Sequence, residues 1–102
     1  MEGTKGYDKA DISLARFARA MSHPARIAVL RLLSVRKSCY FNEISKRLPL
    51  AESTVSQHLT ELKSAGLIVG TSEPPKIKYS INIKELKKVR RLLKRITKIK
   101  AE

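Results

Sequence analysis

Apolar residues recur through the first half of the chain at the spacing of amphipathic helices. From Asp8 onward they broadly keep a period of three to four residues, which predicts a first helix. A second helix follows from Pro24, a residue that suits a first helical turn, and it is apolar almost all round, as a core helix is. The short apolar stretch 38–41 then favours a small strand.

Two further helices with a brief turn between them are predicted in the middle of the chain. Asn42 is a good N-cap for a helix over 43–48, which Pro49 ends. Another helix follows over about 52–65 after only a few residues. This arrangement is typical of a helix-turn-helix.

The second of these helices has a clear inner stripe and a clear end. Val55, Leu59 and Leu62 are four and three residues apart, so they share one face that we expect to be buried. Gly66 is expected to end the helix in the left-handed conformation.

The last third of the chain predicts a hairpin and a long helix. The stretches 67–72 and 76–82 flank Glu73-Pro74-Pro75, and the second alternates apolar and polar residues as a half-buried strand does. A helix is expected from 83 to about 99, with an apolar seam at coiled-coil-like spacing.

The charge changes the picture more than any other compositional feature. Twenty-two Lys and Arg against nine Asp and Glu give the 102 residues a formal net charge of +13. A basic domain of this size usually meets nucleic acid, less often an acidic membrane surface, and sometimes nothing at all. A single cysteine, no signal-peptide-like start and no run of membrane-spanning length favour a cytoplasmic protein.

Three segments of the sequence, together with the predicted order of helices and strands, resemble the arsenic-repressor-like (ArsR/SmtB) family of winged-helix regulators. They are FARAMSHPARIAVLRLL, STVSQHLTELKSAGLI and KYSIN. The resemblance implies a mainly α fold with a small β-hairpin (α+β), a winged helix-turn-helix over 8–102 after a flexible start at 1–7. It also implies a homodimer formed by the N- and C-terminal helices (the latter about 83–100) that binds palindromic operator DNA, most simply as a repressor.

The resemblance assigns the outer face of the helix over 52–65 to DNA. Ser, Thr, Gln and His side chains suit the major groove, because they exchange hydrogen bonds with base edges without a bulky charge. The expected contacts to bases or to the groove are Ser53, Thr54, Ser56, Gln57 and His58. Alternatively, Ser53 and Thr54 merely cap the helix, since Ala51 stands where the family usually has a cap and favours a helix start at Ser53.

Phosphate contacts are expected from cationic residues around that helix and on the hairpin. They are Lys63, Lys76, Lys78 and, near the start of the second helix, Arg26. The hairpin tip carries Glu73 where a cation would help, so a tip with little DNA contact is equally compatible with the sequence.

The dimer interface implied by the resemblance uses apolar residues of the first and last helices. They are Leu14, Phe17, Leu86, Val89, Leu93 and Ile96. The alternative is a cationic amphipathic helix on an acidic bilayer, which lacks a Trp or Phe anchor here.

No metal, cofactor, membrane contact or enzymatic activity is expected, and the inducer is left open. The family's cysteine positions fall on Tyr40 and Asn42, and the last helix has no His, Asp or Cys, so the usual ligand sets are missing. Cys39 is either a redox-active thiol or, more simply, a buried apolar residue. The functional alternative to an operator-binding regulator is a basic domain that binds DNA or RNA nonspecifically or binds another protein.

Overall fold

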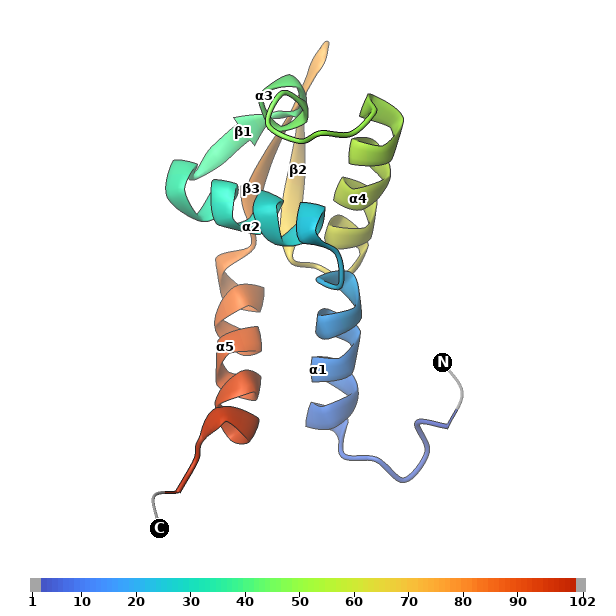
Figure 1. Cartoon of the computed structure of the whole chain (residues 1–102), viewed down its shortest axis with the longest axis vertical. Helices are drawn as coiled ribbons and strands as arrows, with labels where there is room; N and C mark the ends of the chain where they lie inside the picture. Colours follow the sequence, from blue (N-terminus) through green and yellow to red (C-terminus); the bar gives the residue numbers. More distant parts are fainter. Residues whose placement is uncertain (1–2, 101–102) are drawn as a thin grey trace.

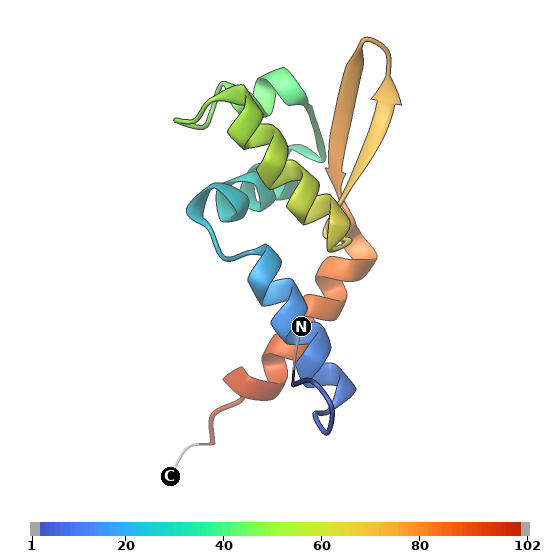
Figure 2. The same cartoon turned by 90° about the vertical axis from the view of Figure 1, so that its right-hand side faces the viewer.

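The computed structural model describes residues 3–100, and over that range the chain forms five helices and three strands (Figures 1 and 2). Their order is α1 (Lys9–Ala20), α2 (Pro24–Arg36), β1 (Ser38–Tyr40), α3 (Phe41–Ser45), α4 (Glu52–Ser64), β2 (Ile68–Glu73), β3 (Lys76–Ile81) and α5 (Ile83–Thr97). The predicted fold class, mainly helical with a small β-hairpin beside a helix-turn-helix, is confirmed.

Side-chain caps explain where three of the helices begin. A carboxylate oxygen of Asp8 accepts a hydrogen bond from the backbone N–H of Ala10 at 2.8 Å, at the start of α1. His23 Nδ1 accepts from Ala25 N at 2.9 Å before α2, and Asn82 Oδ1 accepts from Glu85 N at 3.3 Å in α5. Each cap satisfies a backbone donor that the first helical turn leaves free.

The third helix differs from the prediction at both ends. α3 begins at Phe41, and the Glu43 carboxylate reaches back to accept a hydrogen bond from the N–H of Tyr40 at 2.9 Å. This contact makes Tyr40 the N-cap, so the prediction that Asn42 caps the helix is wrong. The helix also ends at Ser45 rather than near Leu48, and irregular turns lead to α4.

α4 begins at Glu52 with Ala51 as its N-cap, and no side chain caps its first turn. The start agrees with the predicted helix over about 52–65, whereas the alternative start at Ser53 is wrong by one residue, and neither Ser53 nor Thr54 is the cap. Glu52 in the first turn is favourably placed against the helix dipole, and Val55 anchors that turn in the core.

The end of α4 is fixed by Gly66, as predicted. Gly66 has a φ of +81°, its N–H donates to Lys63 O at 2.9 Å, and Leu67 N donates to Leu62 O at 3.0 Å. Leu62 and Leu67 are both fully buried, so the turn is held by an apolar contact as well. This turn directs the chain from α4 straight into β2.

The sheet is antiparallel in the order β1-β3-β2, so β3 lies in the middle. The predicted hairpin is β2–β3, which projects at the end of the molecule opposite α1 and α5 (Figure 1). β1 pairs Cys39 with Tyr79 of β3 and anchors the base of the hairpin to α3. Burial, and then the charge of Glu43, raises the pKa of the Cys39 thiol.

One continuous core joins the helix-turn-helix to the sheet. The predicted inner stripe of α4, Val55, Leu59 and Leu62, is confirmed, since each residue is at most 1% exposed. Other fully buried side chains in the cluster are Phe17, Val29, Leu33, Cys39, Ile44 and Leu67. α4 is therefore held rigidly from behind.

Candidate nucleic-acid interface

The outer face of α4 is a row of small neutral polar side chains that point to solvent. In Figure 2, α4 lies in front of α2, with the hairpin beside it. Its exposed residues include Ser53, Thr54, Ser56, Gln57 and Thr60. Thr60 Oγ1 donates to Ser56 O at 3.0 Å, whereas the other four side chains make no hydrogen bond within residues 3–100.

This geometry matches the requirements of a groove-reading helix. A helix about 10–12 Å across fits a major groove about 12 Å wide. Gln57 carries both donors and an acceptor, and the serine and threonine hydroxyls can act in either sense. The uncapped first turn at Ala51 also leaves backbone N–H groups that suit phosphate oxygens.

His58 is the clear exception among the five predicted groove residues. Its side chain is only 8% exposed, and its Nδ1 accepts a hydrogen bond from Arg26 Nε at 3.0 Å. Its ring centroid lies 4.3 Å from that of His23. The expectation that His58 faces outward is wrong, because position 58 lies on the edge of the stripe that Val55 and Leu62 define.

Burial lowers the pKa of His58, and the neighbouring His23 and Arg26 lower it further. The imidazole is thus kept neutral beside a guanidinium that needs it as an acceptor. His58 positions α4 against α2 instead of facing a base.

Arg26 is half-buried and uses two of its donors inside the protein. Besides the bond to His58, its Nη1 donates to Ala20 O at 3.2 Å. The side chain therefore joins the end of α1 to α4. Its predicted phosphate contact stays a prediction. Only the guanidinium donors that bond to neither His58 nor Ala20 are available for it.

A cationic hollow of about 530 Å³ lies where α1 and α2 meet the C-terminal half of α4. It is lined by Arg16, Arg19, Ala20, Ser22, Arg26, Glu61, Ser64 and Ala65. Arg16 and Arg19 are exposed and were missed by the sequence analysis. The available signal was their spacing of three residues, which puts both on one face of α1.

The hairpin tip is internally neutralised. Glu73 forms an ion pair with Lys78 at 2.8 Å and accepts a hydrogen bond from the Tyr40 hydroxyl at 2.9 Å. These two hydrogen bonds lower the pKa of Glu73, and the same carboxylate raises that of Lys78. Lys76 is exposed, with its Nζ 5.0 Å from the centre of the Tyr40 ring, and Lys63 is exposed on α4.

The residues predicted for the dimer interface divide into two groups. Phe17 is 0% and Val89 is 4% exposed, so both are buried inside one protomer, where α1 packs against α5. Their assignment to an interface between protomers is wrong, because a buried side chain presents no surface to a partner. Leu93 and Ile96 are 38% and 70% exposed, and Leu14 and Leu86 are half-buried.

Within residues 3–100, no three His, Cys, Asp or Glu side chains gather as a metal site requires. None of the described helices is both long and apolar enough to cross a bilayer.

Comparison with known proteins agrees with the geometry. The sequence model of bacterial regulatory proteins of the arsR family matches residues 23–69, from the cap of α2 into β2. The transcriptional regulator CmtR of Mycobacterium tuberculosis (strain ATCC 25618 / H37Rv) is 36% identical over 69 residues, which are 68% of this chain. The chain spans only 58% of the length of CmtR.

Two further relatives are matched over more of their length. The transcriptional regulator YgaV of Escherichia coli (strain K12) is 36% identical over 67 residues, 66% of this chain and 68% of YgaV. The solved structure of HlyU from Vibrio cholerae N16961 has a TM-score of 0.73 at 29% identity and covers 88% of this chain and 97% of HlyU.

Proposed function

Because the chain belongs to the arsR family of bacterial regulatory proteins, we propose that it is a transcription regulator that binds double-stranded operator DNA as a homodimer. The observation that carries this proposal is the outer face of α4. It presents exposed neutral hydrogen-bonding groups on a helix whose opposite face is fully buried. An ordinary solvent-facing helix gains nothing from such a face, whereas a major groove accommodates it.

Base recognition is assigned to Gln57, with Ser53, Thr54 and Ser56 around it. The Gln57 amide can pair with the N6 and N7 edge of an adenine. The three hydroxyl residues lie nearer the N-terminus of α4, where they reach either base edges or the flanking phosphates.

Phosphate contacts are assigned to cations on both sides of α4. Lys63 and Lys76 lie on the side of the hairpin, and Arg16 and Arg19 lie on the side of α1. Lys78 contributes less than the sequence suggests, because Glu73 holds it. A dimer that neutralises about 6–10 phosphates loses roughly 10³–10⁵-fold in affinity between 50 and 200 mM salt.

The homodimer is assigned to the exposed apolar residues of α5. Leu93 and Ile96 present apolar surface on the same helix as the half-buried Leu86, and Leu14 is half-buried on α1, which packs against α5. A two-fold axis there places two copies of α4 on one duplex, which makes the operator an inverted repeat. Such a protein acts in the cytoplasm, where the DNA is.

Repression is the simplest consequence of binding, because occupancy of a promoter by a dimer blocks transcription without further contacts. The relative HlyU, 32% identical over 78 residues, is named a transcriptional activator, so the sign of regulation needs its own measurement. A reporter gene behind the bound sequence measures it: repression lowers expression when the protein is supplied, and activation raises it.

Binding to a selected duplex, followed by fluorescence anisotropy, tests the assignment of α4. Gln57→Ala should weaken binding to that duplex about 5–150-fold for each of the two half-sites, equivalent to about 1–3 kcal/mol per half-site, and leave binding to unrelated duplexes nearly unchanged. Ser34→Ala, an exposed change on α2, is the matched control. Equal binding of all duplexes by the wild type would favour a nonspecific basic domain instead.

A further inference from the structure

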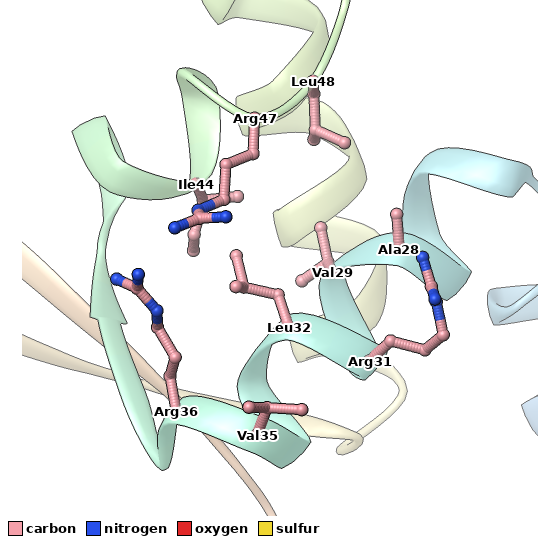
Figure 3. A pocket seen from close by; sticks show the side chains of 9 residues that line it. All are labelled: Ala28, Val29, Arg31, Leu32, Val35, Arg36, Ile44, Arg47 and Leu48. Carbon is pink, nitrogen blue, oxygen red and sulfur yellow. The ribbon is translucent and has the colours of Figure 1, made fainter.

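A second hollow, of about 400 Å³, lies between α2 and α3 (Figure 3). It is lined by Ala28, Val29, Arg31, Leu32, Val35, Arg36, Ile44, Arg47 and Leu48. In Figure 3, α4 lies behind it, so the hollow opens on the side of the helix-turn-helix away from the outer face of α4. The proposed DNA contacts make no use of it.

The floor of this hollow is apolar. Ala28, Leu32 and Val35 are spaced along one face of α2, and Leu48 stands opposite them across the hollow. Val35 is 82% exposed, far more than Leu32, which is half-buried. Contiguous apolar surface that is left in water at a concave site is typical of a binding site.

Three guanidinium groups stand on the rim. Figure 3 shows those of Arg36 and Arg47 on one side of the hollow and that of Arg31 on the other, with Leu32 between them. None of the lining residues is acidic.

Nearby acidic residues neutralise only part of the positive charge of the three arginines. Glu43 pairs with Arg36 at 3.4 Å, but its other oxygen is occupied by the Tyr40 N–H. Within residues 3–100, Arg31 and Arg47 take part in no ion pair. The hollow therefore has a strong, incompletely balanced positive charge above an apolar floor.

We propose that this hollow binds a small amphiphilic organic anion, namely a carboxylate with an aliphatic or aromatic body. The carboxylate would accept paired hydrogen bonds from the guanidinium groups of Arg47 and Arg36, whose planar fork matches its geometry. The body would cover Leu32, Val35 and Leu48.

Simpler ligands leave part of this surface unsatisfied. An inorganic anion leaves the apolar floor in water, and a neutral hydrocarbon leaves guanidinium groups without an acceptor. The volume lies within the range of about 300–1,000 Å³ that is usual for small-molecule sites.

Such a ligand would touch both helices that support α4. Ile44 of α3 and Val29 of α2 line the hollow and are also buried in the core that holds α4. Binding would therefore change or stabilise the position of α3 relative to α2.

Titration of the full chain with sodium octanoate, without DNA, tests the proposal. Amide and methyl NMR signals should follow a saturable one-site curve, with the largest changes at Leu32, Val35 and Leu48. Octanamide, which keeps the body, and acetate, which keeps the charge, should each bind at least about tenfold more weakly, since each loses one half of the interaction.

Matched arginine variants identify the site. Arg47→Gln and Arg36→Gln, which each remove one of the two guanidinium groups assigned to the carboxylate, should each weaken octanoate binding about tenfold. Arg90→Gln, which removes the same charge from an exposed position on α5, should leave it unchanged. Thermal unfolding of each variant shows that its fold is retained.

Any of four results would overturn the proposal. Octanamide could bind as tightly as octanoate, or Arg90→Gln could weaken binding as much as the other variants. The signal changes could fail to saturate, or they could be largest on α5. Because DNA is absent, each of these results leaves the proposed regulatory function unaffected. Conversely, saturable octanoate binding at this site stands even if no operator exists.

Discussion

Nε of Arg26 donates a hydrogen bond to Nδ1 of His58 across 3.0 Å, and this contact ties the start of α2 to the buried side of α4. The same guanidinium bonds to Ala20 O at the end of α1, and the His23 ring packs 4.3 Å from that of His58. One neutral imidazole thus sits at the junction of three helices, beneath the proposed recognition face.

The stability of the protein should fall as the pH drops below about 6.5. The pKa of His58 is lowered in the folded state, whereas the unfolded chain titrates near the ordinary value of about 6.5. Below that pH the unfolded state binds more protons than the folded one, so the free energy of unfolding decreases until the folded pKa is passed. Urea denaturation at pH 7.5, 6.5 and 5.5 measures this decrease.

His58→Asn separates this effect from other titrations. The Asn amide oxygen can replace Nδ1 as the acceptor for Arg26 but does not titrate, so the variant should lose less stability than the wild type between pH 7.5 and 5.5. An equal loss in both proteins would remove His58 as the cause.

Glu73→Gln should strengthen DNA binding by freeing a cation. The substitution keeps an oxygen for the Tyr40 hydroxyl but removes the charge that holds Lys78 at 2.8 Å. If Lys78 of each protomer then reaches a phosphate, the slope of log K against log salt steepens by about 1.8 for the dimer, or about 0.9 for each phosphate. Glu85→Gln, which removes the same charge from the first turn of α5, is the control. An unchanged slope in Glu73→Gln would mean that Lys78 does not reach a phosphate.

Arg16→Gln and Arg19→Gln should weaken binding to all duplexes alike. Both side chains line the cationic hollow beside α4, and phosphate contacts carry no sequence information. Each substitution removes two phosphate contacts from the dimer, so it should reduce the salt slope by about 1.8, or about 0.9 for each contact, without changing the preferred sequence. A variant that altered the preferred sequence instead would place its arginine at a base, and Arg90→Gln serves as the charge-matched control.

Ile96→Asp should convert the dimer to a monomer. Ile96 is 70% exposed in one protomer, so the charge costs little there but disrupts an apolar contact between protomers. Light scattering should report a mass near the 11.5 kDa of one chain for Ile96→Asp and about twice that for the wild type. Val35→Asp, an exposed apolar position on α2, should remain a dimer.

The sequence predicted the order of elements, because helical and strand periods are local properties. The stripe Val55, Leu59, Leu62 and the glycine turn at Gly66 were found for that reason. The boundaries of α3 were not, because Glu43 reaches back to Tyr40 N and overrides the capping preference of Asn42. Such competition between two local caps is decided by geometry that the sequence does not contain.

Within the candidate site, the main error of the prediction concerns the orientation of a side chain at the edge of a helix face. His58 lies on the boundary between the buried stripe and the outer face of α4, and only its partner on α2 decides which way it turns. The assignment of Phe17 and Val89 to the dimer interface fails for a similar reason, because the apolar residues of α1 and α5 do not all face the same way. Some of them pack α1 on α5 inside a protomer, and others, such as Ile96, remain exposed.

Selection of bound duplexes from a random DNA pool, carried out in parallel with the wild type and Gln57→Ala, decides whether α4 reads a DNA sequence. The wild type should enrich an inverted repeat whose half-sites lie about one or a few helical turns apart, and Gln57→Ala should lose the preference at one symmetric pair of positions. If the wild type enriches no sequence, or if Gln57→Ala selects the same sequence equally well, α4 is not the recognition helix.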